Sequence, residues 1–286
     1  MRFGLIANLK RIGAGEAITG FIKWARDTGN ELILCEDLRK SVPDYNKFKP
    51  RDELVRDVDY IVSMGGDGTI LSVVRSVGSA GTPILGINLG SLGFLTQQTP
   101  KELVTALDAI VGGEFRIEKR MMLKVEIPGR GKLNSPYALT DVVLDNGPIS
   151  RVLDVTLNIN GEDIVTYTAD GLIISTPTGS TAYNLAVGGP IVSPGMDAMI
   201  ASPISPFSLT TRPMIIPPGD LLELTVRTDQ RSAMLTMDGQ VGVEIEPHEK
   251  IRIRRAKYRG KFVIFPENSY YKLLRSKLNW GVPPNF

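Results

Sequence analysis

The feature that most constrains the fold is a change of pattern near Arg120. Before it, short apolar runs at residues 2–8, 59–64 and 82–90 alternate with stretches of helical spacing such as 14–27. Continuous apolar strands that alternate with helices are typical of a parallel sheet covered on both faces. We therefore predict an N-terminal α/β domain over residues 1–119.

After Arg120 helical periodicity almost disappears, and short strand-like runs are separated by Gly, Pro, Asn and Asp turns. This pattern predicts an antiparallel all-β domain over residues 120–265, which includes the run KFVIF at 261–265. Residues 269–278 return to helical spacing. A lone terminal helix needs a surface to cover, so we expect segment 266–286 to pack back on the first domain.

Composition excludes several classes of protein. The formal net charge is +2, which gives no case for nucleic acid, and no apolar run approaches the roughly 20 residues of a membrane span. The charged stretch at 249–261 is interpreted as a solvated edge strand, with a phosphate-attracting rim or an RNA-binding strip as alternatives. The single cysteine, Cys35, cannot form an intramolecular disulfide, which suits a cytoplasmic protein. The single histidine, His248, leaves little material for a Ser-His-Asp site or for a protein-held metal.

The stretch SMGGDGTILS at 63–72 follows an apolar run and places three glycines around Asp67. Backbone N–H groups in such a turn, at the start of a helix, are suited to phosphate. It is neither a Walker A loop nor a G-x-G-x-x-G fingerprint. The alternative interpretation is a tight turn in which Asp67 caps the helix.

Two further segments favour a ligand site. NLGSLGFLT at 88–96 again places glycines after a buried strand, and DGLIISTPTGSTAYNLAVGGPIVSP at 170–194 carries a dense set of hydroxyls. Taken alone, the second segment is better interpreted as a loop with local Ser and Thr bonds to the backbone. TMDGQ at 236–240 has the form of an ordinary hairpin turn.

In this order, GGDGT, NLGSLGFL, DGLIISTPTGSTAYNLAVGGPIV and MDGQ resemble the signatures of the NAD kinase family over nearly the whole chain. The first motif is also shared with diacylglycerol and sphingosine kinases. The resemblance implies a Rossmann-like parallel α/β domain and a C-terminal β-sandwich-like domain. It implies ATP-dependent phosphorylation of the 2′-hydroxyl of the adenosine ribose of NAD, which gives NADP. It also implies a divalent cation such as Mg²⁺, carried with ATP, and a homodimer or homotetramer.

The resemblance assigns site residues by position. Asp67 matches the catalytic aspartate, as a base or as a group that orients the hydroxyl. The phosphate and ATP contacts are expected at Gly65, Gly66, Gly68 and Thr69. The NAD contacts are expected at Asp67, Gly68, Thr140, Asp141, Arg151, Thr168, Asp170, Thr181, Ala182, Tyr183, Ala186 and Gln240.

Three of these positions depart from the common family pattern. Thr140 stands where Asn is frequent, Thr168 where a basic residue is common, and Ala186 where Ser is frequent. These departures leave open the choice between NAD and NADH, and between ATP and polyphosphate as donor. The alternatives to an NAD kinase are a lipid or sugar kinase of the same superfamily and a non-catalytic NAD(P)-binding sensor.

Overall fold

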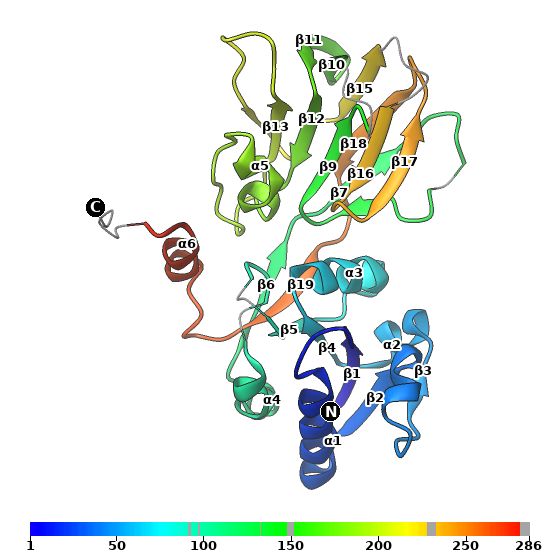
Figure 1. Ribbon diagram of the computed structural model, residues 1–286, viewed down its shortest axis with the longest axis vertical. Coiled ribbons are helices and arrows are strands. Elements are labelled where there is room, and N and C mark those ends of the chain that lie inside the picture. The colour runs from blue at the N-terminus through cyan, green and yellow to red at the C-terminus, as the bar shows by residue number, and fades with distance from the viewer. Residues whose placement is uncertain (91–92, 97, 132, 148–151, 228–232, 281–286) are drawn as a thin grey trace. The chain divides into compact units, whose positions relative to one another are not determined.

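A computed structural model describes residues 1–90, 93–96, 98–131, 133–147, 152–227 and 233–280. The chain folds as two units, which Figure 1 shows with their elements labelled. The first unit is Met1–Lys119 together with the chain from Gly260 onward, and the second is Arg120–Arg259. Each unit is described by itself below.

The first unit is built on a seven-stranded sheet in the order β3-β2-β1-β4-β5-β19-β6. Its strands are β1 (Arg2–Ala7), β2 (Glu31–Cys35), β3 (Phe48–Lys49), β4 (Tyr60–Gly65), β5 (Ile84–Asn88), β6 (Arg116–Arg120) and β19 (Gly260–Ile264). The pairs from β3 through to β19 are parallel. This confirms the parallel sheet that the alternating pattern predicted.

Helices cover both faces of this sheet (Figure 1). These helices are α1 (Ala14–Thr28), α2 (Arg51–Asp57), α3 (Asp67–Val77) and α4 (Leu103–Gly112), and the unit also contains the C-terminal helix α6 (Tyr270–Leu278). Phe3 and Leu5 of β1 share one buried cluster with α1 and α4. On the other face Gly4 lies so close to Ile61 that a side chain there would overlap it, and Leu54 would also be in tight contact. Fully apolar strands are therefore required, because both faces of the sheet are buried.

The strand order reverses beside β1, and this reversal positions the candidate site. β2 and β3 extend the sheet on one side of β1, whereas β4 and β5 extend it on the other. The loops that leave the carboxyl ends of β1 and β4 therefore diverge. In open parallel sheets such a switch point is where ligands bind.

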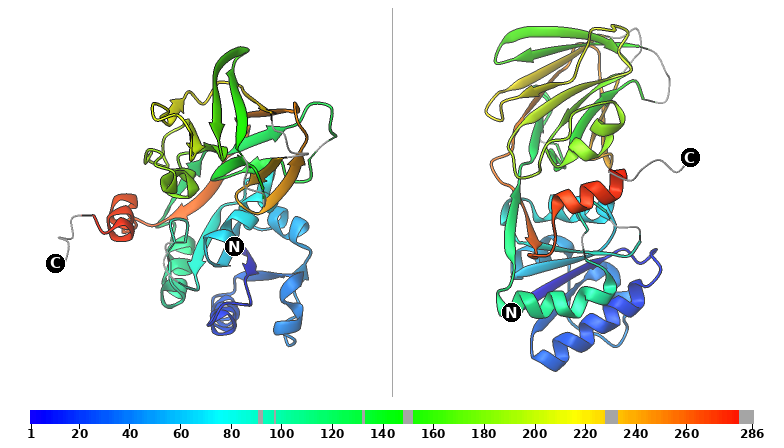
Figure 2. Two further views of the ribbon diagram at one scale, coloured as in Figure 1. Left: turned by 45° about the horizontal axis from the view of Figure 1, so that its top comes forward. Right: turned by 90° about the vertical axis from the view of Figure 1, so that its left-hand side faces the viewer.

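The second unit consists of two six-stranded antiparallel sheets, seen from two further sides in Figure 2. One sheet has the order β11-β10-β15-β18-β7-β8, and the other β14-β13-β12-β9-β16-β17. The strands of the first are β7 (Leu123–Glu126), β8 (Tyr137–Ala138), β10 (Leu153–Ile159), β11 (Glu162–Ala169), β15 (Leu222–Arg227) and β18 (Lys250–Arg255). Those of the second are β9 (Asp141–Asp145), β12 (Gly171–Ser175), β13 (Met199–Ile204), β14 (Met214–Ile216), β16 (Ala233–Met237) and β17 (Val241–Ile245). A short helix, α5 (Tyr183–Ala186), follows β12.

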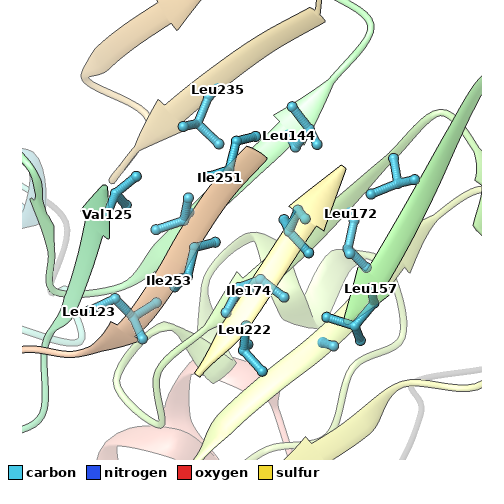
Figure 3. Packing of buried hydrophobic residues seen from close by; sticks show 14 of the residues in the cluster. Leu123, Val125, Leu144, Leu157, Leu172, Ile174, Leu222, Leu235, Ile251 and Ile253 are labelled. Carbon is cyan, nitrogen blue, oxygen red and sulfur yellow. The ribbon is translucent and has the colours of Figure 1, made fainter. Parts of the chain in front are cut away.

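Alternate residues of both sheets point into one apolar core, which Figure 3 shows from close by. Leu123 and Ile253 come from one sheet, and Leu144, Leu172 and Leu235 come from the other. All five side chains are fully buried. Buried and exposed residues alternate along β7 and β18 of the first sheet, whereas β9, β12 and β13 of the second sheet are buried over nearly their whole length.

The structure corrects two sequence-based predictions. The run at 261–265 was placed in the all-β domain, but β19 pairs in parallel with β5 through Phe262 and Ile84. The apolar pattern of a strand does not name its partner, and here the chain returns to the first sheet. β18 was interpreted as an edge strand, but it lies between β15 and β7. Its outward charges instead pair with carboxylates on those neighbours, Arg252 with Glu223 and Arg254 with Glu126.

At the C-terminus, α6 falls within the first unit. Ser269 caps its start, and Leu273 and Leu274 are buried. Just before the helix, Asn268 accepts a 3.0 Å hydrogen bond from Gln98. No described helix has the length and apolar character needed to span a membrane.

A glycine at the start of β12 tests the packing of the second unit. A side chain on Gly171 would overlap the carbonyl oxygen of Leu144, whereas one on Gly195 meets open space. We expect Gly171→Ala to lower the free energy of unfolding by about 1–3 kcal/mol, the usual cost of overpacking. Thermal unfolding followed by circular dichroism measures this, with Gly195→Ala as the control. Equal midpoints for the two variants would contradict the packing described.

Candidate active site

A cavity of about 520 Å³ opens at the carboxyl ends of β1 and β4 in the first unit. It lies at the switch point of the strand order, between the loop after β1 and the first turn of α3. The lining consists of Ile6, Ala7, Asn8, Leu9, Lys10, Arg11, Asp37, Leu38, Arg51, Gly66, Asp67, Gly68, Thr69 and Ser72. The glycine turn of the sequence is thus part of a real concavity.

A second cavity of about 260 Å³ in the same unit is lined by Arg11, Gly66, Asp67, Asn88, Gly90, Gly93, Phe94 and Lys277. Arg11, Gly66 and Asp67 line both cavities. A group held in one cavity and a group held in the other would therefore both reach Asp67. This arrangement suits a transfer between two ligands.

The carboxylate of Asp67 is held by the loop after β5. Its Oδ1 accepts hydrogen bonds from the N–H groups of Leu95 (3.1 Å) and Thr96 (3.2 Å), and from the Thr96 hydroxyl (3.2 Å). Its Oδ2 accepts one from the N–H of Phe94 at 2.8 Å. An ionised carboxylate has no proton to donate, so the Thr96 hydroxyl is the donor. The side chain that the sequence interpretation offered as a helix cap thus fixes a second loop instead.

The two oxygens of Asp67 are left in different states. Each oxygen of a carboxylate has about two lone-pair sites. Oδ1 carries three donors and Oδ2 carries one, counting the described residues. Oδ2 therefore has room for one further donor, such as a hydroxyl. Gly93 permits this close approach, because any side chain there would overlap the carboxylate.

The first cavity has a cationic lining. Lys10, Arg11 and Arg51 face two carboxylates, Asp37 and Asp67. Burial lowers the pKa of the Arg51 guanidinium, and its Nε has no hydrogen-bond partner among the described residues. Together with the positive end of α3, these groups make the cavity attractive to an anion.

In the second unit a buried clip joins the start of β9 to the turn between β16 and β17. The carboxylate of Asp238 accepts hydrogen bonds from the N–H groups of Leu139 (2.9 Å) and Thr140 (2.8 Å) and from the Thr140 hydroxyl (2.9 Å). In return, the N–H of Asp238 donates to the carbonyl of Asp141 at 2.9 Å. The Thr140 hydroxyl is thus engaged within the protein.

The hydroxyl-rich loop at 176–181 is attached to the same place. The Thr176 hydroxyl donates to the carbonyl of Leu139 at 2.6 Å and accepts from the N–H of Gly179 at 3.1 Å. A side chain on Gly179 would overlap the carbonyl of Thr140. The Thr176 hydrogen bond and the close contact at Gly179 therefore hold the 176–181 loop against the start of β9.

A buried amide shapes the turn that follows. Asn184 donates to the carbonyls of Ser180 and Pro190, each at 3.2 Å, and accepts from the Ser202 hydroxyl at 2.6 Å. Its neighbour Tyr183 is left 45% exposed. The turn thus presents an aromatic ring on a fixed backbone, which is the form of a stacking platform.

Asp141 is almost fully buried beside Asp238. Burial, followed by the charge of Asp238, raises the pKa of Asp141 to about 7. At pH 7 the Asp141 carboxyl is therefore protonated in about half of the molecules.

The structure brings some of the predicted residues together and separates others. Gly66, Asp67, Gly68 and Thr69 line the first cavity, while Gly65 lies buried under Thr69. Within the second unit, Thr140, Asp141, Thr181 and the turn before Gln240 meet near one end of β12 and β9. Arg151 lies outside the described residues.

Asp170 and Thr168 lie at the opposite end of β12 from the 176–181 loop. The six-residue step from Asp170 to Thr176 spans roughly 20 Å of extended chain. Thr168 is exposed, and its hydroxyl donates to Asp154 at 2.6 Å. Ala186 lies between the two ends, because the segment after Tyr183 folds over the outer face of the sheet, where Val187 packs on Val143 and Ile173.

Sequence reasoning missed residues that the tertiary structure adds to the site. These are Lys10, Arg11, Asp37, Arg51, Lys277, Asp238 and the backbone of 94–96. The position of Arg11 could have been found from the sequence, since a loop that leaves the first strand of a doubly wound sheet borders the switch point. Arg51 and Lys277 come from α2 and α6, and no local motif marks them.

Comparisons with known proteins agree with this geometry. Residues 3–115 match the ATP-NAD kinase N-terminal domain, and residues 139–265 match the ATP-NAD kinase C-terminal domain. A curated NAD kinase of Syntrophotalea carbinolica is 38% identical over 281 residues, covering 98% of this chain and 99% of the relative. The chain belongs to the ATP-NAD kinase family. A second relative, the NAD kinase of Geotalea daltonii, is 41% identical over 98% of this chain and 97% of its own length.

Solved members of the family share the fold. A crystal structure of yeast NADH kinase complexed with NADH has a TM-score of 0.91 at 25% identity, covering 100% of this chain and 89% of that chain. An NAD kinase from Archaeoglobus fulgidus in complex with ATP has a TM-score of 0.79 at 25% identity, covering 98% and 99%. The α/β unit with two antiparallel sheets is therefore the fold of the ATP-NAD kinase family, as the sequence motifs predicted.

The raised pKa of Asp141 predicts a pH dependence of stability. The folded protein keeps this proton up to about pH 7, whereas the unfolded carboxyl releases it near pH 3.9. The folded state therefore binds more protons between these values, and the free energy of unfolding falls as the pH rises through this window. The substitution Asp141→Asn removes this pH-dependent fall in the free energy of unfolding, which amounts to at most about 4 kcal/mol. Denaturant unfolding should show that the free energy of unfolding of Asp141→Asn, relative to that of the wild type, is higher at pH 8 than at pH 5.

The control for this experiment is Glu162→Gln, an exposed carboxyl in the same unit. Its stability relative to the wild type should not change between the two pH values. If the difference in free energy of unfolding between Asp141→Asn and the wild type is the same at pH 5 and pH 8, the raised pKa is contradicted.

Proposed function

We propose that this chain transfers the γ-phosphoryl group of ATP to the 2′-hydroxyl of the adenosine ribose of NAD and so forms NADP. The carrying observation is the carboxylate of Asp67, which borders two cavities and keeps one open lone-pair site on Oδ2. Membership of the ATP-NAD kinase family and the curated NAD kinases at about 40% identity support the activity.

The donor phosphates belong in the first cavity. N–H groups at the start of α3, from Gly66 to Thr69, and the cations Lys10 and Arg51 would hold them there. The described residues contain no cluster of three metal-ligating side chains. Mg²⁺ would fit here as a companion of the phosphates, and Asp37 and Asp67 are the carboxylates of the cavity lining that could help to hold it. When bound, it neutralises charge on the β- and γ-phosphates.

The acceptor hydroxyl would reach Asp67 from the second cavity. Its O–H donates to Oδ2, which orients the oxygen toward the γ-phosphorus and accepts the proton as the new O–P bond forms. The bond between the γ-phosphorus and the bridging oxygen breaks, and its electron pair leaves with ADP. The three donors on Oδ1 keep the carboxylate still during this exchange.

The second unit carries its own set of proposed NAD contacts. We assign Asp141, Thr181, Ala182 and Tyr183 to this role, with Tyr183 as an aromatic platform. The remaining proposed contacts are Thr140, Arg151, Thr168, Asp170, Ala186 and Gln240. Because the Thr140 hydroxyl is bound to Asp238, its contact to NAD is proposed through the backbone.

The cellular setting is also a proposal. We infer a cytoplasmic homodimer or homotetramer, in line with the lone buried Cys35 and the resemblance to the family. ATP is the proposed donor and NAD the proposed acceptor. Purified protein supplied with Mg²⁺ and each donor and acceptor in turn, with NADP or NADPH measured by a coupled dehydrogenase, tests these choices. No phosphorylated dinucleotide under any combination would overturn the proposal.

Replacement of Asp67 tests the proposed active site. Asp67→Asn puts an amide N–H₂ against the backbone donors of the 94–96 loop and removes the proton acceptor. We expect kcat for NADP formation to fall by about 10²–10⁴-fold, the usual size of a general-base contribution. Asp52→Asn is the matched control, since Asp52 is an exposed aspartate in the first turn of the neighbouring helix α2. Similar rates for the two variants would count against the assignment.

The anchoring of Asp67 can be tested at Thr96, which is fully buried. Thr96→Val keeps the shape and the backbone donor but removes the hydroxyl that donates to Oδ1. We expect a loss of about 1–3 kcal/mol in stability and a lower kcat, because hydrogen bonds to charged groups are worth this much. Thr96→Ser, which keeps the hydroxyl, should retain most of both. The comparison requires thermal unfolding and steady-state kinetics on all three proteins.

A further inference from the structure

We propose that Arg11 is a catalytic cation of this transfer, whose guanidinium binds the phosphoryl group as it passes from the donor to the ribose hydroxyl. The inference rests on the proposed function and adds to it the group that stabilises the transferred charge. It is carried by the place of Arg11 between two glycine loops and by its presence in both cavities.

The loop that carries Arg11 is fixed at both ends. At its start, the N–H of Asn8 donates to the carbonyl of Met64 at the end of β4 (2.9 Å), and the Asn8 side chain accepts from the N–H of Lys10 (3.1 Å). The N–H of Arg11 donates to the carbonyl of Asn8, and the carbonyl of Arg11 accepts from Ala14 at the start of α1. The Cα of Arg11 is therefore held next to the end of β4, where Asp67 follows.

The guanidinium of Arg11 lies between the two glycine loops. A Cβ built on Gly66 would stand 3.8 Å from its Nη2, and one built on Gly90 would stand 3.6 Å from its Nη1. Gly66 directly precedes Asp67, and Gly90 belongs to the loop whose later residues hold Asp67. The charged end of Arg11 thus reaches the space that the two cavities share.

Arg11 differs from the other cations of the site in its position and its pairing. Arg51 and Lys10 line the first cavity, and Lys277 lines the second, whereas Arg11 lines both. Among the described residues no side-chain hydrogen bond or ion pair engages its guanidinium, and the side chain is exposed. Its donors are therefore available to a ligand without the loss of an existing ion pair.

The chemistry of the step requires such a group. As the ribose oxygen bonds to the γ-phosphorus and the bond to the leaving oxygen breaks, negative charge spreads over the equatorial oxygens. A guanidinium presents a planar fork of N–H donors that matches two phosphate oxygens and stays charged at all working pH values. An arginine from the same chain can fill this role, and its removal costs several orders of magnitude in related transfers.

The experiment compares Arg11→Gln with the wild type in steady-state NADP formation from ATP and NAD. We expect kcat to fall by about 10²-fold or more, with the KM values for NAD and ATP within a few-fold of the wild type. A group that acts mainly in the transition state changes kcat in this way, whereas a group that only holds ATP changes its KM. Thermal unfolding midpoints show whether the variant is folded, and none of the contacts described depends on the Arg11 side chain.

The matched control is Arg51→Gln, which removes a guanidinium from the first cavity alone. It should raise the KM for ATP more than it lowers kcat. As a second measurement, added guanidinium ion should restore part of the kcat of Arg11→Ala and have no such effect on Arg51→Ala. Rescue of this kind requires a missing charge at the reacting group and does not arise from a structural role.

The outcomes separate the two proposals. A wild-type protein that forms no phosphorylated dinucleotide overturns the proposed function, and this inference falls with it. An active wild type together with an Arg11→Gln variant of unchanged kcat overturns the inference alone. An Arg11→Gln variant that raises only the KM for ATP also overturns it, because Arg11 is then a ground-state ligand of the donor.

Discussion

The candidate site of the first unit is organised by one interaction, the contact between the Asp67 carboxylate and the backbone of residues 94–96. It joins the start of α3 to the loop after β5, and so connects two loops that leave neighbouring parallel strands. The contact requires a glycine at Gly93, because a side chain there would occupy the space of the carboxylate. The same contact distinguishes the two oxygens of Asp67 and leaves Oδ2 open to a ligand. In the proposed function, the same side chain therefore both anchors the loop and takes part in the chemistry.

Around that contact the sheet supplies the space. Because the strand order reverses at β1, the loops after β1 and β4 diverge, and the cavity between them receives the first turn of α3. Cations then enter from elements far apart in the sequence, such as Arg11 after β1 and Arg51 in α2. A phosphoryl transfer asks the protein for positioning and charge stabilisation, and these are what a rigid sheet edge with converging cations provides.

In the second unit another aspartate carboxylate accepts hydrogen bonds from the backbone of a separate segment. Asp238 closes a hairpin turn, as its sequence indicated, but its carboxylate also binds the backbone and hydroxyl of Thr140. This places two carboxylates, Asp141 and Asp238, close together under the 176–181 loop, and burial holds the pKa of Asp141 near 7. The hydroxyl-rich loop is in turn docked by Thr176. A short polar side chain that saturates backbone donors is thus the common means by which this protein fixes its glycine- and threonine-rich segments.

The sequence by itself determined the layers, the class of protein and the central aspartate. Alternating apolar runs and helical periods predict a covered parallel sheet, because strands buried on both faces are apolar throughout. Short strand-like runs between Gly, Pro, Asn and Asp turns predict antiparallel sheets, because closely spaced turns connect neighbouring strands. The four motifs identified the family, and the resemblance assigned Asp67 the role that is proposed for it. Only the tertiary structure decided that β19 joins β5, that Arg11 stands between two glycine loops, and that the backbone of 94–96 holds Asp67. Strand partners and backbone donors leave no mark in local composition, since every residue except proline offers the same N–H group and what matters is where the fold aims it.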